Sequence, residues 1–408
     1  MPQKKRILIV MSDTGGGHRA AAEAIRAALL EKHPDEAEIV LVDGFRAAGF
    51  PYKYAPELYP WWINNTRTSW EIGYKLLDTP VRARLATQGI YFTAQNGLKK
   101  MFRANPADMI VCVHSVLTQV SLQALMRYEN RPPFVVVVTD LASTHHFWYD
   151  RRAERTLVPS QDAYEIALEA GMKPEKVRIT GLPVHPQFAR SLDDRTAIRR
   201  ELGWNLDLPT FLLVGGGDGM GPLYKTARAI NEKGLKCQVV IVAGRNKALK
   251  EKLEAVQWNQ PTHIYGYVTT MPRLMAAANV LITKAGPATI SEAFIAHLPM
   301  ILYDAIPGQE TGNVELVVKN KAGIYAPGPS LVADTAESWL KEGPDGLKRR
   351  AEAAARLAKP NAVWDIADEI WTHAQTPFVR NRRRRRAALL KQIAPTVKIP
   401  KMKIRLLD

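Results

Sequence analysis

The chain has 408 residues, 46% of them hydrophobic and 24% charged, and this composition excludes a wholly disordered protein. Its length suits two domains, and two cysteines, Cys112 and Cys237, cannot form the disulfide framework of a small secreted protein. The net charge of +16 is uneven, because residues 376–408 carry eleven Lys and Arg against a single acid. The longest apolar runs fall far short of the about 20 residues that cross a bilayer, so we expect a cytosolic protein.

The first half of the sequence alternates short apolar strands with helices. An alanine-rich helix is predicted over residues 20–31. Because the strands are apolar throughout, the pattern predicts a parallel sheet covered on both faces, in a doubly wound α/β domain spanning residues 1–187. The strands are predicted over residues 7–11, 39–42, 109–113, 134–139 and 156–158.

An aromatic segment, residues 45–80, interrupts this alternation with nine aromatic side chains in 36 residues. One interpretation is a packed insertion with a small core of its own. The other is an amphipathic surface that meets lipid, because Trp and Tyr favour membrane interfaces. The residues alone leave both interpretations open.

The alternation stops at the proline-rich residues 181–186 and then starts again, which predicts a second doubly wound domain over residues 188–360. In such folds ligands bind at the carboxyl ends of the strands, so we expect a site in the cleft between the domains. The strands of this half are predicted over residues 211–214, 238–242, 263–265, 280–283 and 300–303.

A glycine turn over residues 12–20 connects the first strand to the first helix. Glycines allow close backbone approach to a ligand, and a helix N-terminus favours an anion. The helix dipole should keep His18 neutral, and a neutral imidazole at a cleft suits a general base acting on a hydroxyl. A capping or packing histidine is the alternative. The spacing of Gly15, Gly17 and Ala20, with Asp43 after the second strand, also fits a loose dinucleotide fingerprint, so an NAD-dependent oxidoreductase is a rival function.

Three more polar turns follow predicted strands, at residues 215–222, 283–292 and 304–313. The first is a glycine turn that suits close approach to phosphate. The other two supply amide and carboxylate groups, which are suitable partners for sugar hydroxyls. Helix capping explains any one of them, but all four turns lie where a doubly wound fold binds its ligand.

Several segments, in order, resemble monogalactosyldiacylglycerol synthases. These are SDTGGGHRAAAEAI (12–25), TDLASTHHFW (139–148), GGGDGMGP (215–222), AGRNK (243–247), YGYV (265–268), ITKAGPATISEA (282–293) and IPGQETGNV (306–314). The broader relatives are processive diacylglycerol glucosyltransferases and the peptidoglycan glycosyltransferase that acts on lipid I. The resemblance implies a GT-B fold, in which two Rossmann-like doubly wound domains face each other across a cleft.

The resemblance also implies a reaction: inverting transfer of galactose from UDP-galactose to diacylglycerol, with UDP-glucose as the alternative donor. His18 matches the proposed base, and no cofactor or metal is expected. Acceptor or membrane contacts are implied for His145, Trp148, Trp61 and Trp62. The residues implied in UDP-sugar binding are Gly17, Gly217, Gly219, Gly221, Arg245, Val268, Lys284, Gly286, Thr289, Glu292, Gln309, Glu310 and Asn313.

The resemblance assigns acceptor and membrane binding to residues 1–187, UDP-sugar binding to residues 188–360, and a helix crossing back to the first domain to residues 361–378. The basic tail, residues 379–408, lies outside it. Arg382 to Arg386 precede a short apolar stretch, which suits attraction to anionic membrane lipid and a place on the cytoplasmic face of the cell membrane. RNA binding and a solvated tail are the alternatives, with nucleic acid the less favoured partner.

Overall fold

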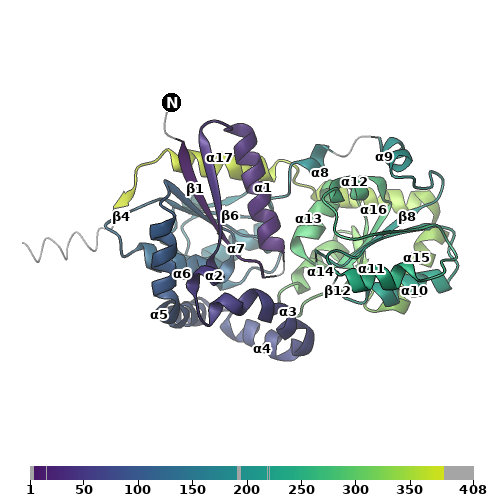
Figure 1. The fold of residues 1–408 in the computed structure, drawn as a ribbon, viewed down its shortest axis with the longest axis horizontal. Coiled ribbons are helices and arrows are strands. Elements are labelled where there is room, and N and C mark those ends of the chain that lie inside the picture. Colours follow the sequence, from purple (N-terminus) through teal and green to yellow (C-terminus); the bar gives the residue numbers. More distant parts are fainter. Residues whose placement is uncertain (1–3, 15, 191–193, 218, 220, 381–408) are drawn as a thin grey trace, which may run out of the picture.

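Two α/β domains lie side by side in the computed structural model, which describes residues 4–14, 16–190, 194–217, 219 and 221–380 (Figure 1). Each domain contains a six-stranded sheet in which every neighbouring pair of strands is parallel. The parallel, doubly covered sheets predicted from the apolar strands are confirmed.

The first sheet has the strand order β2-β1-β3-β5-β6-β7. Successive residues of β1 face opposite sides: Ile7 and Ile9 enter one core cluster, and Leu8 and Val10 the other. Both faces are therefore apolar, which explains the continuous apolar run. The strands are β1 (Lys5–Met11), β2 (Ala37–Asp43), β3 (Met109–Cys112), β5 (Phe134–Val137), β6 (Arg155–Val158) and β7 (Val177–Ile179).

Helices cover both faces of this sheet. The α1 helix (Gly17–Lys32) lies on one face, and α5 (Pro80–Ala104) and α6 (Ser115–Leu125) contribute to the core on the other. The α7 helix (Gln161–Glu169) packs with the α5 and α6 side.

The second sheet has the order β10-β9-β8-β11-β12-β13. Successive strands are added toward one edge from β8 to β10 and toward the other edge from β11 to β13, so the strand order reverses between β8 and β11. Ligands bind doubly wound sheets at such a switch point. The strands are β8 (Thr210–Val214), β9 (Gln238–Val242), β10 (Thr262–Tyr265), β11 (Val280–Lys284), β12 (Met300–Asp304) and β13 (Gly323–Tyr325). The helices are α9 (Arg195–Glu201), α10 (Leu223–Glu232), α11 (Lys247–Glu254), α12 (Met271–Ala277), α13 (Pro287–Ile295), α14 (Thr311–Lys319), α15 (Pro329–Lys341) and α16 (Gly343–Leu357).

The last described helix, α17 (Ala362–Ala374), returns to the first domain and lies along α1 (Figure 1). Its apolar face joins the core that contains β1, and its Glu369 forms ion pairs with Arg155 and Arg178. After it, β14 (Val379–Arg380) pairs with β4 (Asn130–Arg131) in antiparallel fashion. The rest of the basic tail, from residue 381, lies outside the described residues.

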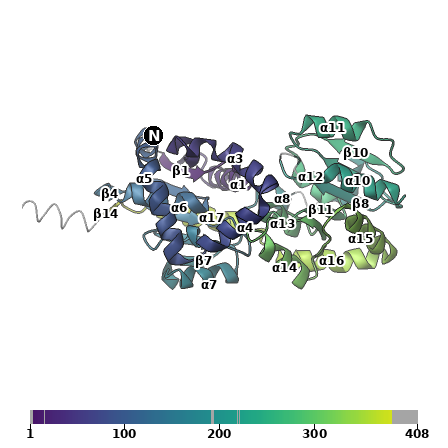
Figure 2. The same ribbon diagram turned by 90° about the horizontal axis from the view of Figure 1, so that it is seen from below.

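The aromatic segment forms α2 (Gly44–Ala48), a 3₁₀ turn η1 (Tyr52–Tyr54), α3 (Ala55–Asn65) and α4 (Arg67–Leu77). The last two helices lie on the side of the first domain that faces the second (Figure 2). Phe45 is buried in the domain core, whereas Trp61 is 62% exposed, so the segment has a packed side and an apolar exposed side. Within the described part of the chain, no helix is long and apolar enough to cross a membrane.

Candidate active site

His18 lies in the first turn of α1, immediately after the loop that leaves β1, and is half-buried. Its Nδ1 is 2.9 Å from the Thr139 hydroxyl oxygen, and that hydroxyl donates to the carbonyl of Val113 at 3.3 Å. A hydroxyl has one proton to donate, so Thr139 must accept from Nδ1–H of His18. This arrangement selects the tautomer in which Nε2 carries a lone pair. Among the described residues Nε2 has no hydrogen-bond partner.

Burial keeps this imidazole neutral. It lowers the pKa of His18 to about 4, against the opposing effect of the Val113 carbonyl. The His114 ring lies 4.3 Å away between centroids, and burial, together with the charge that His18 would carry, holds the pKa of His114 well below its usual range. A neutral His18 with a free lone pair is therefore in the form that accepts a proton from a hydroxyl.

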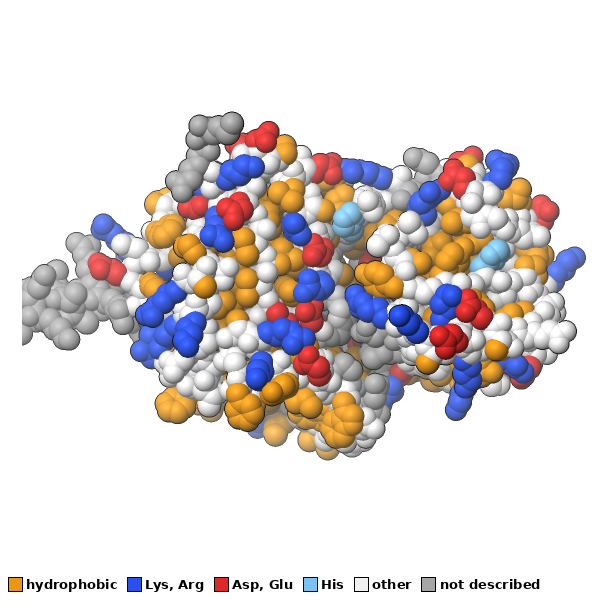
Figure 3. Space-filling view, in the orientation of Figure 1, with side chains coloured by type: hydrophobic (Ala, Val, Ile, Leu, Met, Phe, Trp, Pro, Cys, Tyr) orange, Lys and Arg blue, Asp and Glu red, His pale blue; other side chains and the backbone are white. Residues whose placement is uncertain are grey.

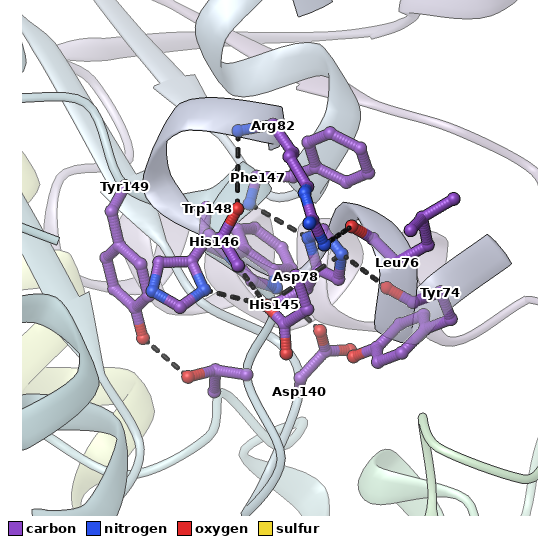
Figure 4. A network of polar contacts seen from close by, with 12 residues as sticks. Tyr74, Leu76, Asp78, Arg82, Asp140, His145, His146, Phe147, Trp148 and Tyr149 are labelled. Atoms are coloured by element: carbon purple, nitrogen blue, oxygen red, sulfur yellow. Dashed lines mark hydrogen bonds and ion pairs between the residues drawn. The ribbon is translucent and has the colours of Figure 1, made fainter. Parts of the chain in front are cut away.

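The loop of residues 140–149 is held by hydrogen bonds within itself and by hydrogen bonds to Tyr74 and Asp78 (Figure 4). Trp148 is fully buried, its centroid is 6.2 Å from that of His18, and its Nε1 donates to Asp140 at 2.6 Å. His145 is also buried and contacts the carbonyl of Tyr74. Both residues were expected on the acceptor side of the cleft. Both side chains are buried in the structure, and their contact with the acceptor stays a prediction.

The glycine turn after β8 packs against two other segments of the same domain, at Ala243 and Tyr303. A Cβ on Gly219, whose φ is +60°, would come within 2.1 Å of the Ala243 carbonyl oxygen, and one on Gly221, at φ +90°, within 2.9 Å of the Tyr303 ring. Internal packing therefore already requires these two glycines. Asp218 and Met220 of this turn lie outside the described residues.

Two other residues implied in donor binding lie beside this turn. The Arg245 guanidinium is 4.6 Å from the centroid of the Tyr267 ring, and a Cβ on Gly217 would come 3.3 Å from Arg245 Nη1. Val268, next to Tyr267, is half-buried against the domain core. Gly17, by contrast, opens α1 in the first domain with nothing within 4 Å of a Cβ placed there.

Three residues implied in UDP-sugar binding follow β12: Gln309 and Glu310 in the loop, and Asn313 in the first turn of α14. Glu310 is buried; one oxygen accepts from Lys284 Nζ at 3.3 Å and the other from the Ile306 N–H at 2.8 Å. Asn313 donates to the Ala285 carbonyl and accepts from the N–H of Ala142, a residue of the first domain. Each side chain keeps hydrogen-bonding capacity beyond these bonds, so a contact of either with the UDP-sugar stays a prediction.

The third of them is Gln309, whose Oε1 accepts from the hydroxyl of Tyr59 at 3.1 Å. The bond joins the two domains, because Tyr59 belongs to α3.

The α13 helix, which contains Thr289 and Glu292, contacts α1 across the domain boundary. Gly286 caps it and Pro287 is its first residue, so its first-turn N–H groups are available to an anion. Glu292 is half-buried with no hydrogen-bond partner among the described residues, and burial raises its pKa to about 8. An unpaired carboxylate of this kind suits a hydroxyl-bearing ligand.

The dinucleotide fingerprint is not favoured by the structure. Its acidic residue, Asp43, caps α2 and accepts hydrogen bonds at 2.9 Å from three backbone N–H groups, those of Asp13, Phe45 and Arg46. The carboxylate is thus already occupied. Gly15 of the fingerprint lies outside the described residues, and in the part that the structure describes no group of three His, Cys, Asp or Glu side chains is placed to hold a metal ion.

Sequence reasoning did not single out Thr139, Asp140 or His114 as site residues. They follow β5 and β3, so the rule that ligands bind at the carboxyl ends of parallel strands could have found them. Tyr59 offered no such signal, since its role depends on how the two domains meet.

Comparison with known proteins gives the family. Residues 18–184 match the monogalactosyldiacylglycerol (MGDG) synthase family and residues 210–370 the C-terminal domain of glycosyltransferase family 28. The chain is 38% identical over 384 residues to a probable monogalactosyldiacylglycerol synthase 2, chloroplastic, of Oryza sativa subsp. japonica, covering 91% of this chain and 81% of the relative. It is 36% identical over 378 residues to the chloroplastic synthase of Spinacia oleracea, covering 90% and 72%.

Solved structures with 13–14% sequence identity share the fold. MurG of Acinetobacter baumannii superposes with a TM-score of 0.58, covering 91% of this chain and all of that one. CalG4, the calicheamicin glycosyltransferase, gives 0.56 over 96% and 100%. These neighbours and the two parallel sheets confirm the predicted GT-B fold. The family model and the sequence relatives establish that the chain belongs to the monogalactosyldiacylglycerol synthase family.

Proposed function

We propose that this protein transfers galactose from UDP-galactose to the free hydroxyl of diacylglycerol, with inversion at the anomeric carbon. The names of the sequence relatives support galactose and diacylglycerol over the alternative of a glucosyltransferase using UDP-glucose. The observation that carries the proposal is the chain of hydrogen bonds from His18 through Thr139 to Val113, which leaves Nε2 of His18 able to take a proton.

In the proposed reaction, Nε2 of His18 removes the hydroxyl proton of diacylglycerol as its oxygen attacks the anomeric carbon. The bond from that carbon to the diphosphate oxygen breaks, and UDP leaves with the electron pair. The first-turn N–H groups of α13 and the backbone of the glycine turn after β8 would stabilise the charge that develops on UDP. Ribose hydroxyls would donate hydrogen bonds to the carboxylate of Glu292. The absence of a metal requirement stays a prediction.

One assay tests this proposal. The purified protein is mixed with diacylglycerol in anionic liposomes and is offered UDP-galactose or UDP-glucose separately, with and without EDTA. Monogalactosyl lipid from UDP-galactose, at a rate that EDTA leaves unchanged, is the expected product. Glucosyl lipid or a series of lipids with several sugars would overturn the galactosyl assignment, and loss of activity in EDTA would overturn the metal-independent mechanism.

Thr139 should affect catalysis without touching the donor. Thr139→Val removes the acceptor for Nδ1–H of His18 and permits the tautomer with a protonated Nε2, so we expect kcat to fall about tenfold or more, while the Kd of UDP stays unchanged. Thr139→Ser keeps the hydroxyl and should retain most of the turnover. Steady-state kinetics of the two variants test this role, because an equal loss of kcat in both would mean that Thr139 acts through packing and not through its hydroxyl.

We also propose that the protein binds the surface of the membrane that contains its acceptor, on the cytoplasmic face. Exposed apolar side chains gather along the lower edge of the first domain, over α3, α4 and α5 (Figure 3). They repeat at helical spacings, so each helix offers one apolar face, and grouped exposed apolar side chains often mark a surface that binds a partner or a membrane. The side chains are Leu58, Trp61 and Trp62 of α3, Ile72 and Leu76 of α4, and Val81, Leu85 and Phe92 of α5.

Shortening this apolar patch should weaken membrane binding. The double substitution Leu58→Ala and Trp61→Ala is expected to lower the partition coefficient on liposomes about tenfold or more, because both side chains would lose apolar contact with lipid. Leu331→Ala, at an exposed leucine of the second domain, is the matched control. Co-sedimentation with liposomes measures the effect, and equal binding of both variants would contradict the proposal.

The basic tail gives a separate, charge-dependent prediction. Deleting residues 381–408 should weaken binding to anionic liposomes, at about 1 kcal/mol per basic residue near the surface, with little effect on neutral liposomes. Added salt should reduce the difference. Unchanged binding would exclude the tail as an anchor, and salt-sensitive binding of RNA by the full chain alone would favour the nucleic-acid alternative.

A further inference from the structure

A single hydrogen bond connects the aromatic segment to Gln309, one of the residues implied in UDP-sugar binding. Tyr59 of α3 donates from its hydroxyl to Oε1 of Gln309 at 3.1 Å, across the domain boundary. Gln309 lies between β12 and α14. Among the described residues, its amide has no other hydrogen bond.

The rest of this loop is held independently of Tyr59. The carboxylate of Glu310 bonds to the Ile306 N–H and to Lys284, and the Gly312 N–H donates to the hydroxyl of Ser143 at 3.0 Å. The loop backbone is therefore fixed by other contacts. What Tyr59 determines is the orientation of the Gln309 side chain.

Tyr59 is itself firmly seated. Its ring packs edge to face on Trp70, with 5.3 Å between centroids. On the next helix, Arg67 donates to both oxygens of Asp304 at 2.8 and 2.6 Å, at the end of β12. A Cβ on Gly308 would come 3.2 Å from the Tyr74 ring. The helices α3 and α4 thus contact residues 304–309 at three points.

The hydrogen bond between Tyr59 and Gln309 does not change with pH in the working range. Burial, together with the negative charge of Glu310, raises the pKa of the Tyr59 phenol far above its ordinary value, so the hydroxyl stays protonated. Tyr59 remains a donor, and Oε1 of Gln309 remains the acceptor. The NH₂ group of the amide, with its two N–H donors, is left for a ligand.

We infer that Tyr59 is a positioning residue of the donor site, which turns the amide of Gln309 so that its NH₂ group faces the hydroxyls of the donor sugar. The inference rests on the proposed function, since it takes Gln309 to contact the sugar. Galactose and glucose differ in the orientation of one hydroxyl, and a rigid pair of donors discriminates between them better than a freely rotating amide. The helix that exposes Leu58 and Trp61 would thereby also set donor selectivity.

The test is Tyr59→Phe, which removes the hydroxyl and keeps the ring. We expect the KM for UDP-galactose to rise about three- to tenfold, as for the loss of one neutral hydrogen bond, and the preference for UDP-galactose over UDP-glucose to fall. The Kd of UDP, which lacks the galactose, should not change, and neither should binding to liposomes. Unchanged KM and selectivity would overturn the inference, as would equal losses for UDP and UDP-galactose.

Two further variants separate this inference from the proposed function. Tyr52→Phe also removes a hydrogen-bonded hydroxyl of the aromatic segment, but its partner, Thr93, is in the same domain, so donor kinetics should stay normal. Gln309→Ala should raise the KM for UDP-galactose at least as much as Tyr59→Phe, and the double variant should lose nothing more. A normal KM in Gln309→Ala would show that this amide does not contact the donor sugar. A normal KM in Tyr59→Phe alone would overturn the positioning role of Tyr59 and leave the proposed function intact.

Discussion

Replacing His18 with alanine should lower kcat for galactosyl transfer by about 10²–10⁴-fold and leave the affinity for UDP close to that of the unaltered protein. The expectation follows from the tautomer: Nδ1–H donates to Thr139, and Nε2 is the atom able to take the acceptor proton. Gln replacing His18 offers polar atoms without a basic nitrogen, so it should be as inactive as the alanine variant.

Single-turnover assays with bound UDP-galactose would measure this effect apart from donor binding. The control is His263→Ala, at a half-buried histidine of the second domain that lies near Trp204. Near-normal turnover in His18→Ala would exclude the base assignment, and a parallel loss of UDP affinity would indicate that His18 serves the donor.

The pH profile tests the same assignment with His18 in place. Burial lowers the pKa of His18 to about 4 in the free protein, so in the Glu292→Gln background, which removes the pH dependence of that carboxyl group, kcat/KM for UDP-galactose should fall only as the pH drops toward 4. The diphosphate of a bound donor is negatively charged and favours the imidazolium, which raises this pKa. The acidic limb of kcat should therefore lie at higher pH than that of kcat/KM. Coincident limbs would contradict a base next to the diphosphate.

The fold was predictable because most strands are buried on both faces and so read as continuous apolar runs. Two edge strands were not found. In β7, Val177 is followed by Arg178 and a partly exposed Ile179, and β13 consists of Gly323 and two partly exposed residues. The other two edge strands, β2 and β10, were found, so the apolar signal is lost only where an edge strand is short and its side chains are polar or exposed.

Candidate site residues were predictable from sequence only where a polar or titratable side chain lies in the segment that follows a strand. His18 and Glu292 follow parallel strands in their own domains, so local pattern and resemblance both reached them. The bond between Tyr59 and Gln309 depends on how two separately folded domains dock. The burial of Trp148 behind His18 likewise depends on the path of the intervening loop. Neither arrangement is present in local sequence.

Glu292→Gln should make the ligand-free protein more stable at neutral pH while weakening its affinity for UDP-galactose about tenfold or more. Burial raises the pKa of Glu292 from 4.5 to about 8, so between these values the folded chain binds a proton that the unfolded chain has released. Folding then takes up a proton, and the stability of the native protein falls as the pH rises from about 4.5 to about 8. Glutamine is neutral in both states and is free of this cost.

Binding of UDP-galactose should favour the ionised form of Glu292, whereas the ligand-free protein favours the protonated form. Hydroxyls of the donor would bond most strongly to the ionised carboxylate, and a charge-assisted bond contributes about 1.5–3 kcal/mol. Binding therefore releases the proton, so the affinity for UDP-galactose should increase with pH up to about 8 and then level off, while Glu292→Gln should show no such dependence. Thermal melting and calorimetric titration from pH 6 to 9 measure both effects. A glutamine variant that melts lower and binds the donor normally would mean that this carboxylate stabilises the fold and does not contact the ligand, because a group kept unpaired for a ligand should cost stability until the ligand arrives.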